Sequence, residues 1–164
     1  VVGQELGCGY WDSQWRCSDG SPHYAKEHAV VDPVYTYIPN GRPGARAPHL
    51  FIGANRFYKQ IHSIQSYFGD RFVCLIHGVY NSQEMERLSN AFKLPFSYYS
   101  VGEKGCELPD IQGCFAKYYG LQPGGAVLVR PDGHIAWRQR NASHKNITPG
   151  LESALRNCLS CTQI

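Results

Sequence analysis

The sequence lacks long apolar runs, blocks of one charge and a high charge density overall. No stretch approaches the roughly 20 apolar residues that cross a bilayer, and no basic segment followed by an apolar one marks a signal peptide at the start. Charged residues make up 18%, and 16 basic against 13 acidic residues leave a scattered net charge of +3. This pattern excludes the basic face of a nucleic-acid-binding protein. We therefore expect neither a membrane nor a nucleic acid as partner.

Methionine is scarce as well, because Met85 is the one methionine and the chain does not begin with another. The missing initiator predicts either processing or a segment cut from a longer protein.

With 164 residues and 43% hydrophobic residues, the chain can bury one substantial core. The seven cysteines are an odd number at irregular spacing in a chain that does not need disulfides, so a reduced, cytoplasmic setting is expected.

Motifs for metals and cofactors are also missing. No Gly-x-Gly-x-x-Gly follows a strand, so no dinucleotide-binding loop is predicted. The histidines lack the spacing of a zinc site: His23 and His28 are five apart in an irregular segment, without an accompanying Cys-x-x-Cys. We expect neither a metal nor a cofactor in this chain.

What is present most clearly is an antiparallel hairpin near the C-terminus. Ala126 to Val129 is a continuous aliphatic run typical of a buried strand, and Pro131-Asp132-Gly133 supplies the turn. His134 to Arg138 alternates outward polar with inward apolar residues, with Trp137 as a large anchor. A strand, turn and strand are therefore predicted here.

The N-terminal part predicts little regular structure. Residues 1–48 carry prolines among glycines and isolated aromatics, a composition typical of an extended arm lying over a folded body. Trp11, Trp15, Tyr35 and Tyr37 are expected to pin it. We therefore divide the chain into an arm at 1–48 and a domain at 49–164.

Hydrophobic periodicity predicts alternating strands and helices in that domain. Strands are expected at 50–52, 72–76, 96–101, 126–129 and 134–138, and helices at 61–68, from Ser82 to Phe92, from Asp110 to Gly120 and from Thr148 onward. Ser82 and Asp110 are the expected N-caps, and Gly120 is an expected stop. The order β-α-β-α-β-α-β-β-α after the arm resembles the thioredoxin fold, an α/β fold, and we expect mainly parallel strand pairs with an antiparallel hairpin at the edge.

The redox motifs of a thioredoxin are absent from their places. Where a Cys-x-x-Cys would open the helix after the second strand, this chain reads His77-Gly78-Val79-Tyr80-Asn81. Gly124-Gly125 stands where a cis-proline is expected. Cys158 and Cys161 have suitable spacing, but the end of a helix disfavours a thiolate, so we interpret them as an incidental pair.

Three motifs in order resemble a known family. They are Tyr10-Trp11-Asp12-Ser13, Arg42 to His49, and Val127 to Arg138. Together they resemble the C-terminal thioredoxin-like domain of FAD-dependent aromatic hydroxylases, of the phenol 2-monooxygenase and aromatic-polyketide hydroxylase type. The resemblance implies that N-terminal domains hold FAD, NADPH and the phenolic substrate, while this domain packs against them and helps the protein to dimerise.

A few side chains are candidates for acid–base chemistry. Arg46 and His49 flank Pro48, where a guanidinium and an imidazole could converge on a phenolate or carboxylate. The alternative, which we prefer, is that Arg46 ties the arm to the body. Tyr118 and His134 complete the candidates, although Asp132 beside His134 is better interpreted as part of the turn.

Arg130 and Arg138 are expected on a solvated face or in an ion pair with a neighbouring domain.

Two functions remain open from the sequence. The first is a non-catalytic assembly or dimerisation module of a flavin-dependent hydroxylase. The second is a free-standing cyclase, isomerase or dehydratase that acts on a phenolic or polyketide intermediate.

Overall fold

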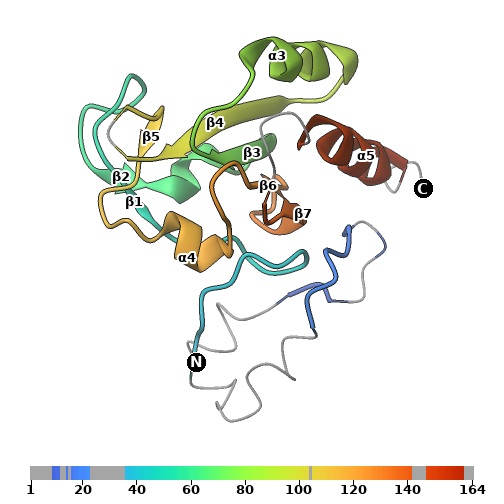
Figure 1. Ribbon diagram of the computed structural model, residues 1–164, viewed down its shortest axis with the longest axis horizontal. Coiled ribbons are helices and arrows are strands. Elements are labelled where there is room, and N and C mark those ends of the chain that lie inside the picture. Colours follow the sequence, from blue (N-terminus) through green and yellow to red (C-terminus); the bar gives the residue numbers. More distant parts are fainter. Residues whose placement is uncertain are drawn as a thin grey trace.

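The computed structural model describes residues 9–11, 14, 16–22, 36–103, 105–141 and 147–160. A mixed sheet of five strands lies at the centre, in the order β5-β4-β3-β6-β7 (Figure 1). Its strands are β3 (Phe72–His77), β4 (Phe96–Gly102), β5 (Leu108–Pro109), β6 (Ala126–Val129) and β7 (Ile135–Gln139). The predicted α/β, thioredoxin-like fold is confirmed, and so is the hairpin of β6 and β7.

The central strand shows why the sheet has two cores. Side chains alternate between the faces of a strand, so the unbroken apolar run of β3 must be covered on both sides. Val73 and Leu75 enter one hydrophobic cluster, whereas Cys74 and Ile76 enter the other. The strand is accordingly buried except at its ends.

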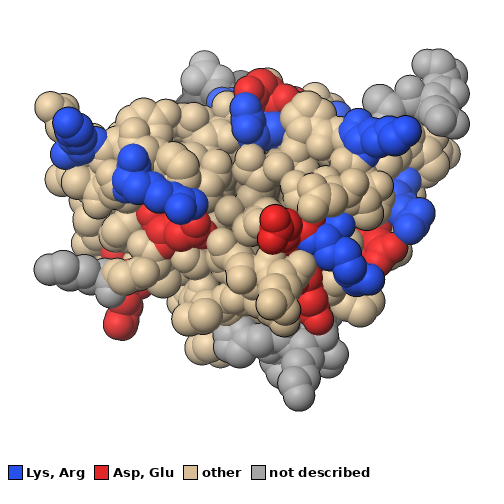
Figure 2. All heavy atoms as spheres, turned by 90° about the horizontal axis from the view of Figure 1, so that it is seen from above, with Lys and Arg blue, Asp and Glu red and all other residues tan. Residues whose placement is uncertain are grey.

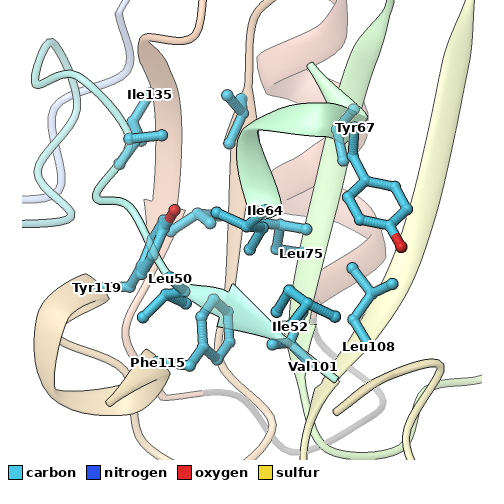
Figure 3. Close-up of a cluster of buried hydrophobic side chains, with 14 of the residues drawn as sticks. Leu50, Ile52, Ile64, Tyr67, Leu75, Val101, Leu108, Phe115, Tyr119 and Ile135 are labelled. Atoms are coloured by element: carbon cyan, nitrogen blue, oxygen red, sulfur yellow. The ribbon is translucent and has the colours of Figure 1, made fainter. Parts of the chain in front are cut away.

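Each face has its own covering layer. Helices α3 (Ser82–Ala91) and α5 (Ile147–Ser160) cover one face. The other is covered by β1 (Phe51–Ile52), β2 (His62–Ser63), the 3-10 helix η1 (Ile64–Tyr67) and α4 (Phe115–Tyr119). Figure 3 shows Leu50 and Ile52 packed beside Phe115 in this second core. None of the described helices combines the length and apolarity needed to cross a membrane.

The first predicted strand and helix differ from the structure. β1 lies outside the five-stranded sheet and pairs antiparallel with β2. The helix expected at 61–68 is β2 followed by one turn of η1, because Ser63 caps that turn and Ile64 and Tyr67 alone bury their side chains. The expectation of mainly parallel pairs is wrong for β6, which runs antiparallel to β3.

Two of the predicted helix caps also differ from those in the structure. Helix α3 is capped by Asn81, one residue before Ser82, and the Asn81 side chain accepts from the backbone N–H groups of Gln83 and Glu84. Asp110 does not begin a helix, because its carboxylate closes a turn and α4 starts only at Phe115. The predicted stop at Gly120 is confirmed, with a left-handed φ of 65°.

The described parts of the arm cover the outer edge of β7. The backbone N–H of Gly44 donates to the Ile135 carbonyl (2.7 Å), and the N–H of Ile135 donates to the Ala45 carbonyl (2.8 Å). Further along, the N–H of Cys17 donates to the Ala136 carbonyl (2.8 Å). These bonds occupy an edge that would otherwise be open to other chains.

The expected outward-polar alternation in the second hairpin strand is wrong. Residues 135–138 are all buried: Ile135 lies in one core, Ala136 and Trp137 lie in the core with α5, and the arm covers Arg138. Trp11 and Tyr37 are partly buried, as expected for arm anchors, whereas Trp15, Tyr35, His23 and His28 lie outside the described residues.

Candidate functional site

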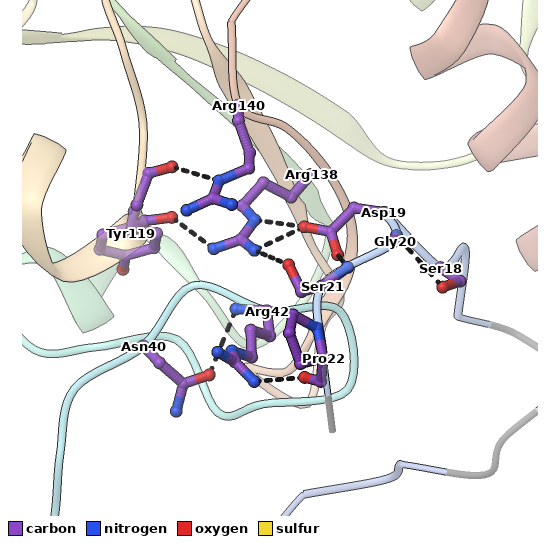
Figure 4. A network of polar contacts seen from close by, with 11 residues as sticks. Ser18, Asp19, Gly20, Ser21, Pro22, Asn40, Arg42, Tyr119, Arg138 and Arg140 are labelled. Carbon is purple, nitrogen blue, oxygen red and sulfur yellow. Dashed lines mark hydrogen bonds and ion pairs between the residues drawn. The ribbon is translucent and has the colours of Figure 1, made fainter. Parts of the chain in front are cut away.

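Arg138 of β7 fastens the arm to the sheet (Figure 4). The residue is 5% exposed, and its guanidinium lies between the arm and the end of α4. Nε donates to Asp19 Oδ2 (2.6 Å), Nη2 donates to Ser21 Oγ (2.6 Å), and Nη1 donates to the Tyr119 carbonyl (3.1 Å). Each guanidinium nitrogen has a partner, which a buried charge requires.

Burial and charge act in opposite directions on this pair. Burial raises the pKa of the Asp19 carboxyl, but the hydrogen bonds of Ser21 and the charge of Arg138 outweigh it and hold that pKa below its ordinary value. Burial lowers the pKa of the Arg138 guanidinium, yet a guanidinium remains protonated in proteins. The pair is therefore ionised at neutral pH, and charge as well as hydrogen bonding holds the arm.

Two more arginines extend this network. Arg42 Nη1 donates to the Pro22 carbonyl (2.5 Å), and Arg140 Nε donates to the Gly120 carbonyl (3.4 Å). A cavity of about 130 Å³ lies between segments of the arm, and its lining includes Trp11, Arg16, Ser18, Asp19 and Arg42. The expectation of a solvated face or an outside partner is wrong for Arg138, because its carboxylate partner comes from the arm of the same chain.

The structure brings two of the four candidate residues together. Arg46 and His134 lie directly opposite each other in an antiparallel bridge. His49 is exposed, and its ring meets Phe51 edge-on. Tyr118 is partly buried on α4, where its contact with Cys114 raises the pKa of its hydroxyl. Acid or base roles for these residues stay predictions.

Asp132 serves the turn, as the sequence predicts. Its Oδ1 accepts from the backbone N–H of His134 (3.1 Å), and Arg130 Nη2 lies 3.2 Å from Oδ2. Burial raises the pKa of Asp132, but the contacts with His134 and Arg130 outweigh it and lower that pKa. Both oxygens of the Asp132 carboxylate are thus already paired. Beside this turn lies a cavity of about 210 Å³, which Arg46 and Gln65 help to line.

The end of β3 and the start of α3, where a thioredoxin carries its cysteines, suit neither redox chemistry nor dinucleotide binding. Cys74 lies inside β3, where burial raises the pKa of its thiol. A dinucleotide phosphate would need open N–H groups at the start of α3, but the Asn81 side chain takes those of Gln83 and Glu84. Cys158 is buried on α5, and Cys161 lies outside the described residues.

Across the described residues, no peptide bond is cis, and no three of the His, Cys, Asp and Glu side chains gather as metal ligands would. Figure 2 shows basic and acidic side chains interspersed on one face of the molecule. The charge distribution on this face matches the scatter along the sequence.

Sequence reasoning missed a second polar network around Glu107. Its Oε2 accepts from the Tyr80 hydroxyl (2.8 Å) and from the Ser100 backbone N–H (3.1 Å), while Arg56 Nη2 lies 2.5 Å from Oε1. Burial and the Glu107 contact both raise the pKa of Tyr80. Tyr80 and Arg56 lie 27 and 51 residues from Glu107 in the chain, and contacts over such sequence separations leave no local pattern. No signal in the sequence therefore points to this network.

Comparison with known proteins identifies one family. Residues 40–160 match the family model described as aromatic-ring hydroxylase, C-terminal. The chain is 40% identical over 121 residues to 4-methyl-5-nitrocatechol 5-monooxygenase of Burkholderia sp, which covers 73% of this chain and 21% of that protein. It is 33% identical over 123 residues to aklavinone 12-hydroxylase RdmE of Streptomyces purpurascens, with 74% and 22% covered.

Solved structures give the same picture. A ternary complex of aklavinone-11 hydroxylase with FAD and aklavinone has a TM-score of 0.76 at 29% identity, over 98% of this chain and 28% of that one. The flavin-dependent monooxygenase PieE, in complex with FAD and substrate, has a TM-score of 0.77 at 29% identity, over 96% and 26%. The part matched by this chain thus makes up between 21% and 28% of these relatives.

Proposed function

Because the chain belongs to the family of C-terminal domains of aromatic-ring hydroxylases, we propose that it is a non-catalytic assembly module, which packs against the flavin-binding domains of such an enzyme. The observation that carries the proposal is the match over residues 40–160, in relatives of which the matched part makes up 21–22%. FAD, NADPH and the phenolic or polyketide substrate are then held by the rest of the hydroxylase.

The geometry of the polar residues supports this assignment. The buried ion pair of Arg138 with Asp19 holds the chain's own arm in place. Asp132 is paired within its turn, and the N-terminus of α3 is capped by Asn81. These groups stabilise the domain, so they are not available to polarise a substrate.

One observation favours the alternative, a small enzyme acting on phenolic or polyketide intermediates. Arg46 lies opposite His134, so a cation and a possible general base are neighbours at the surface. Under this alternative, the pair would bind a phenolate and move a proton.

Titration of the purified 164-residue chain separates the two functions. With FAD, and with phenol, catechol and naphthol as probes, calorimetry of an assembly module gives no saturable heat and absorbance shows no turnover. Saturable binding or conversion that is lost in Arg46→Ala and His134→Ala would overturn the proposal in favour of the enzyme. Ser97→Ala is the matched control, since Ser97 lies on β4, away from the pair.

A further inference from the structure

The exposed apolar surface of the domain is concentrated in one hairpin, residues 51–63, here called the aromatic hairpin. Four of the eight large hydrophobic side chains exposed in the described part of the chain belong to it. They are Phe51 at 45%, Phe57 at 46%, Tyr58 at 39% and Ile61 at 62% exposure. Clustered apolar exposure of this kind marks an interaction surface, whereas single exposed residues do not.

The hairpin is held in a fixed conformation. Asn55 Oδ1 accepts from the backbone N–H groups of Phe57 (2.8 Å) and Tyr58 (3.2 Å), and Asn55 Nδ2 donates to the Tyr67 hydroxyl (3.1 Å). His62 Nε2 lies 2.9 Å from that same hydroxyl, and its ring stacks on Tyr58 with centroids 4.1 Å apart. A partner therefore meets an ordered surface and loses little conformational entropy on binding.

The shape and composition are those of an interface core. A groove of about 670 Å³ lies beside the hairpin, and its lining includes Phe57, Tyr58, Tyr67, Arg71 and Tyr99. The Arg56 guanidinium lies 4.7 Å above the Phe57 ring. Aromatic residues and arginine are enriched where interfaces bury most binding energy.

The net charge of this surface is small. The aromatic hairpin contains Arg56 and Lys59 and no acidic residue, but Arg56 is already paired with Glu107 of the same chain. The surface therefore fits a mainly apolar recess on a different protein body.

The lengths of the relatives supply that body. This chain matches a C-terminal domain and covers 21% of 4-methyl-5-nitrocatechol 5-monooxygenase and 28% of aklavinone-11 hydroxylase. Most of each hydroxylase therefore lies outside the part matched by this chain. Domains in one chain usually share interfaces of about 600–1,500 Å².

We propose that the aromatic hairpin is the surface on which the flavin-binding part of the hydroxylase docks, an inference that rests on the proposed assembly function. Phe57 and Tyr58 are the central anchors. The hairpin lies at the opposite end of the domain from α5, so α5 stays outside this contact (Figure 1).

The test uses 4-methyl-5-nitrocatechol 5-monooxygenase in which this chain replaces the segment that it matches. Hydroxyl-radical labelling is compared between this fusion and the 164-residue chain alone. Labelling of Phe57, Tyr58 and Ile61 is expected to fall several-fold in the fusion, while that of Val79 and Leu159 is unchanged. In the fusion with Phe57→Ser and Tyr58→Ser, labelling of Ile61 returns to the level of the separate chain. The matched control Val79→Ser, an exposed apolar residue outside the hairpin, leaves Ile61 protected.

The other outcomes are distinguishable. Protection confined to a different face overturns the hairpin as docking surface and leaves the assembly function standing. Equal labelling of every residue in the fusion and the separate chain contradicts both proposals. Hairpin labelling that falls as the concentration of the separate chain rises shows that a second copy covers this surface, and this also overturns the inference.

Discussion

Among single residues, Arg138 and Asp19 have the largest expected effect on stability. Their side chains are 4% and 7% exposed, so each charge depends on the other for its solvation. Sequence reasoning placed Arg138 on a solvated face or in an ion pair with a neighbouring domain, because strand alternation assigns it to the outer face. The arm reverses that assignment by covering this face with a carboxylate that lies 119 residues away.

Asp19→Asn is expected to lower the free energy of unfolding by about 3–5 kcal/mol, because it leaves the Arg138 guanidinium buried without its counter-charge. Urea denaturation followed by tryptophan fluorescence measures the change. Asp70→Asn is the matched control, since Asp70 pairs with Arg71 at the exposed surface and its loss should leave the midpoint unchanged. Equal midpoints for all three proteins would contradict the structural role of the pair.

The same carboxyl predicts a pH dependence. Its pKa is lower in the folded protein than its ordinary value, so its ionisation stabilises the fold above the unfolded pKa of about 4. That stabilisation is lost as the pH falls through the folded pKa. The difference in unfolding free energy between wild type and Asp19→Asn should be constant from about pH 7 to 5 and shrink below about pH 4. A difference independent of pH down to the acid transition would rule out this ionisation as its source.

At the level of elements, the sequence and the structure name different N-caps for α3: Ser82 in the prediction and Asn81 in the structure. Asn81→Ala should cost about 1 kcal/mol, because it removes the acceptor for the first N–H groups of the helix. Ser82→Ala changes the predicted cap and should cost much less. Thermal unfolding by circular dichroism measures both variants, and a larger loss in Ser82→Ala would show that the helix begins one residue later.

The whole molecule depends on its arm as a covering layer. A shortened chain beginning at His23 lacks Asp19, Ser21 and the backbone that pairs with β7 at Cys17. It should lose stability and associate through the part of the β7 edge that Cys17 covers in the original chain, as gel filtration would show. Adding Arg138→Met to the shortened chain should restore part of the stability, because an apolar side chain needs no partner. A shortened chain as stable as the original would show that the first 22 residues are only a connection.

How much the sequence predicts depends on the range of each interaction. The β6–β7 hairpin, the buried strand β3 and the end of α4 at Gly120 follow from neighbouring residues, because turn chemistry, continuous apolar runs and a left-handed glycine act locally. The resemblance to the hydroxylase domain rests on motifs of the same local kind. The helix expected at 61–68 failed because only one turn of it faces the core.

The sequence by itself determined the α/β fold, the absence of the thioredoxin cysteines from their usual place and the family to which the domain belongs. Only the tertiary structure decided that Arg138 is buried, that Arg46 meets His134 and that exposed aromatic residues gather on one ordered hairpin. The first two features join segments that are far apart in the chain, and the energies of all three depend on burial and distance. Neither quantity exists until the arm, the sheet and the hairpin have packed together.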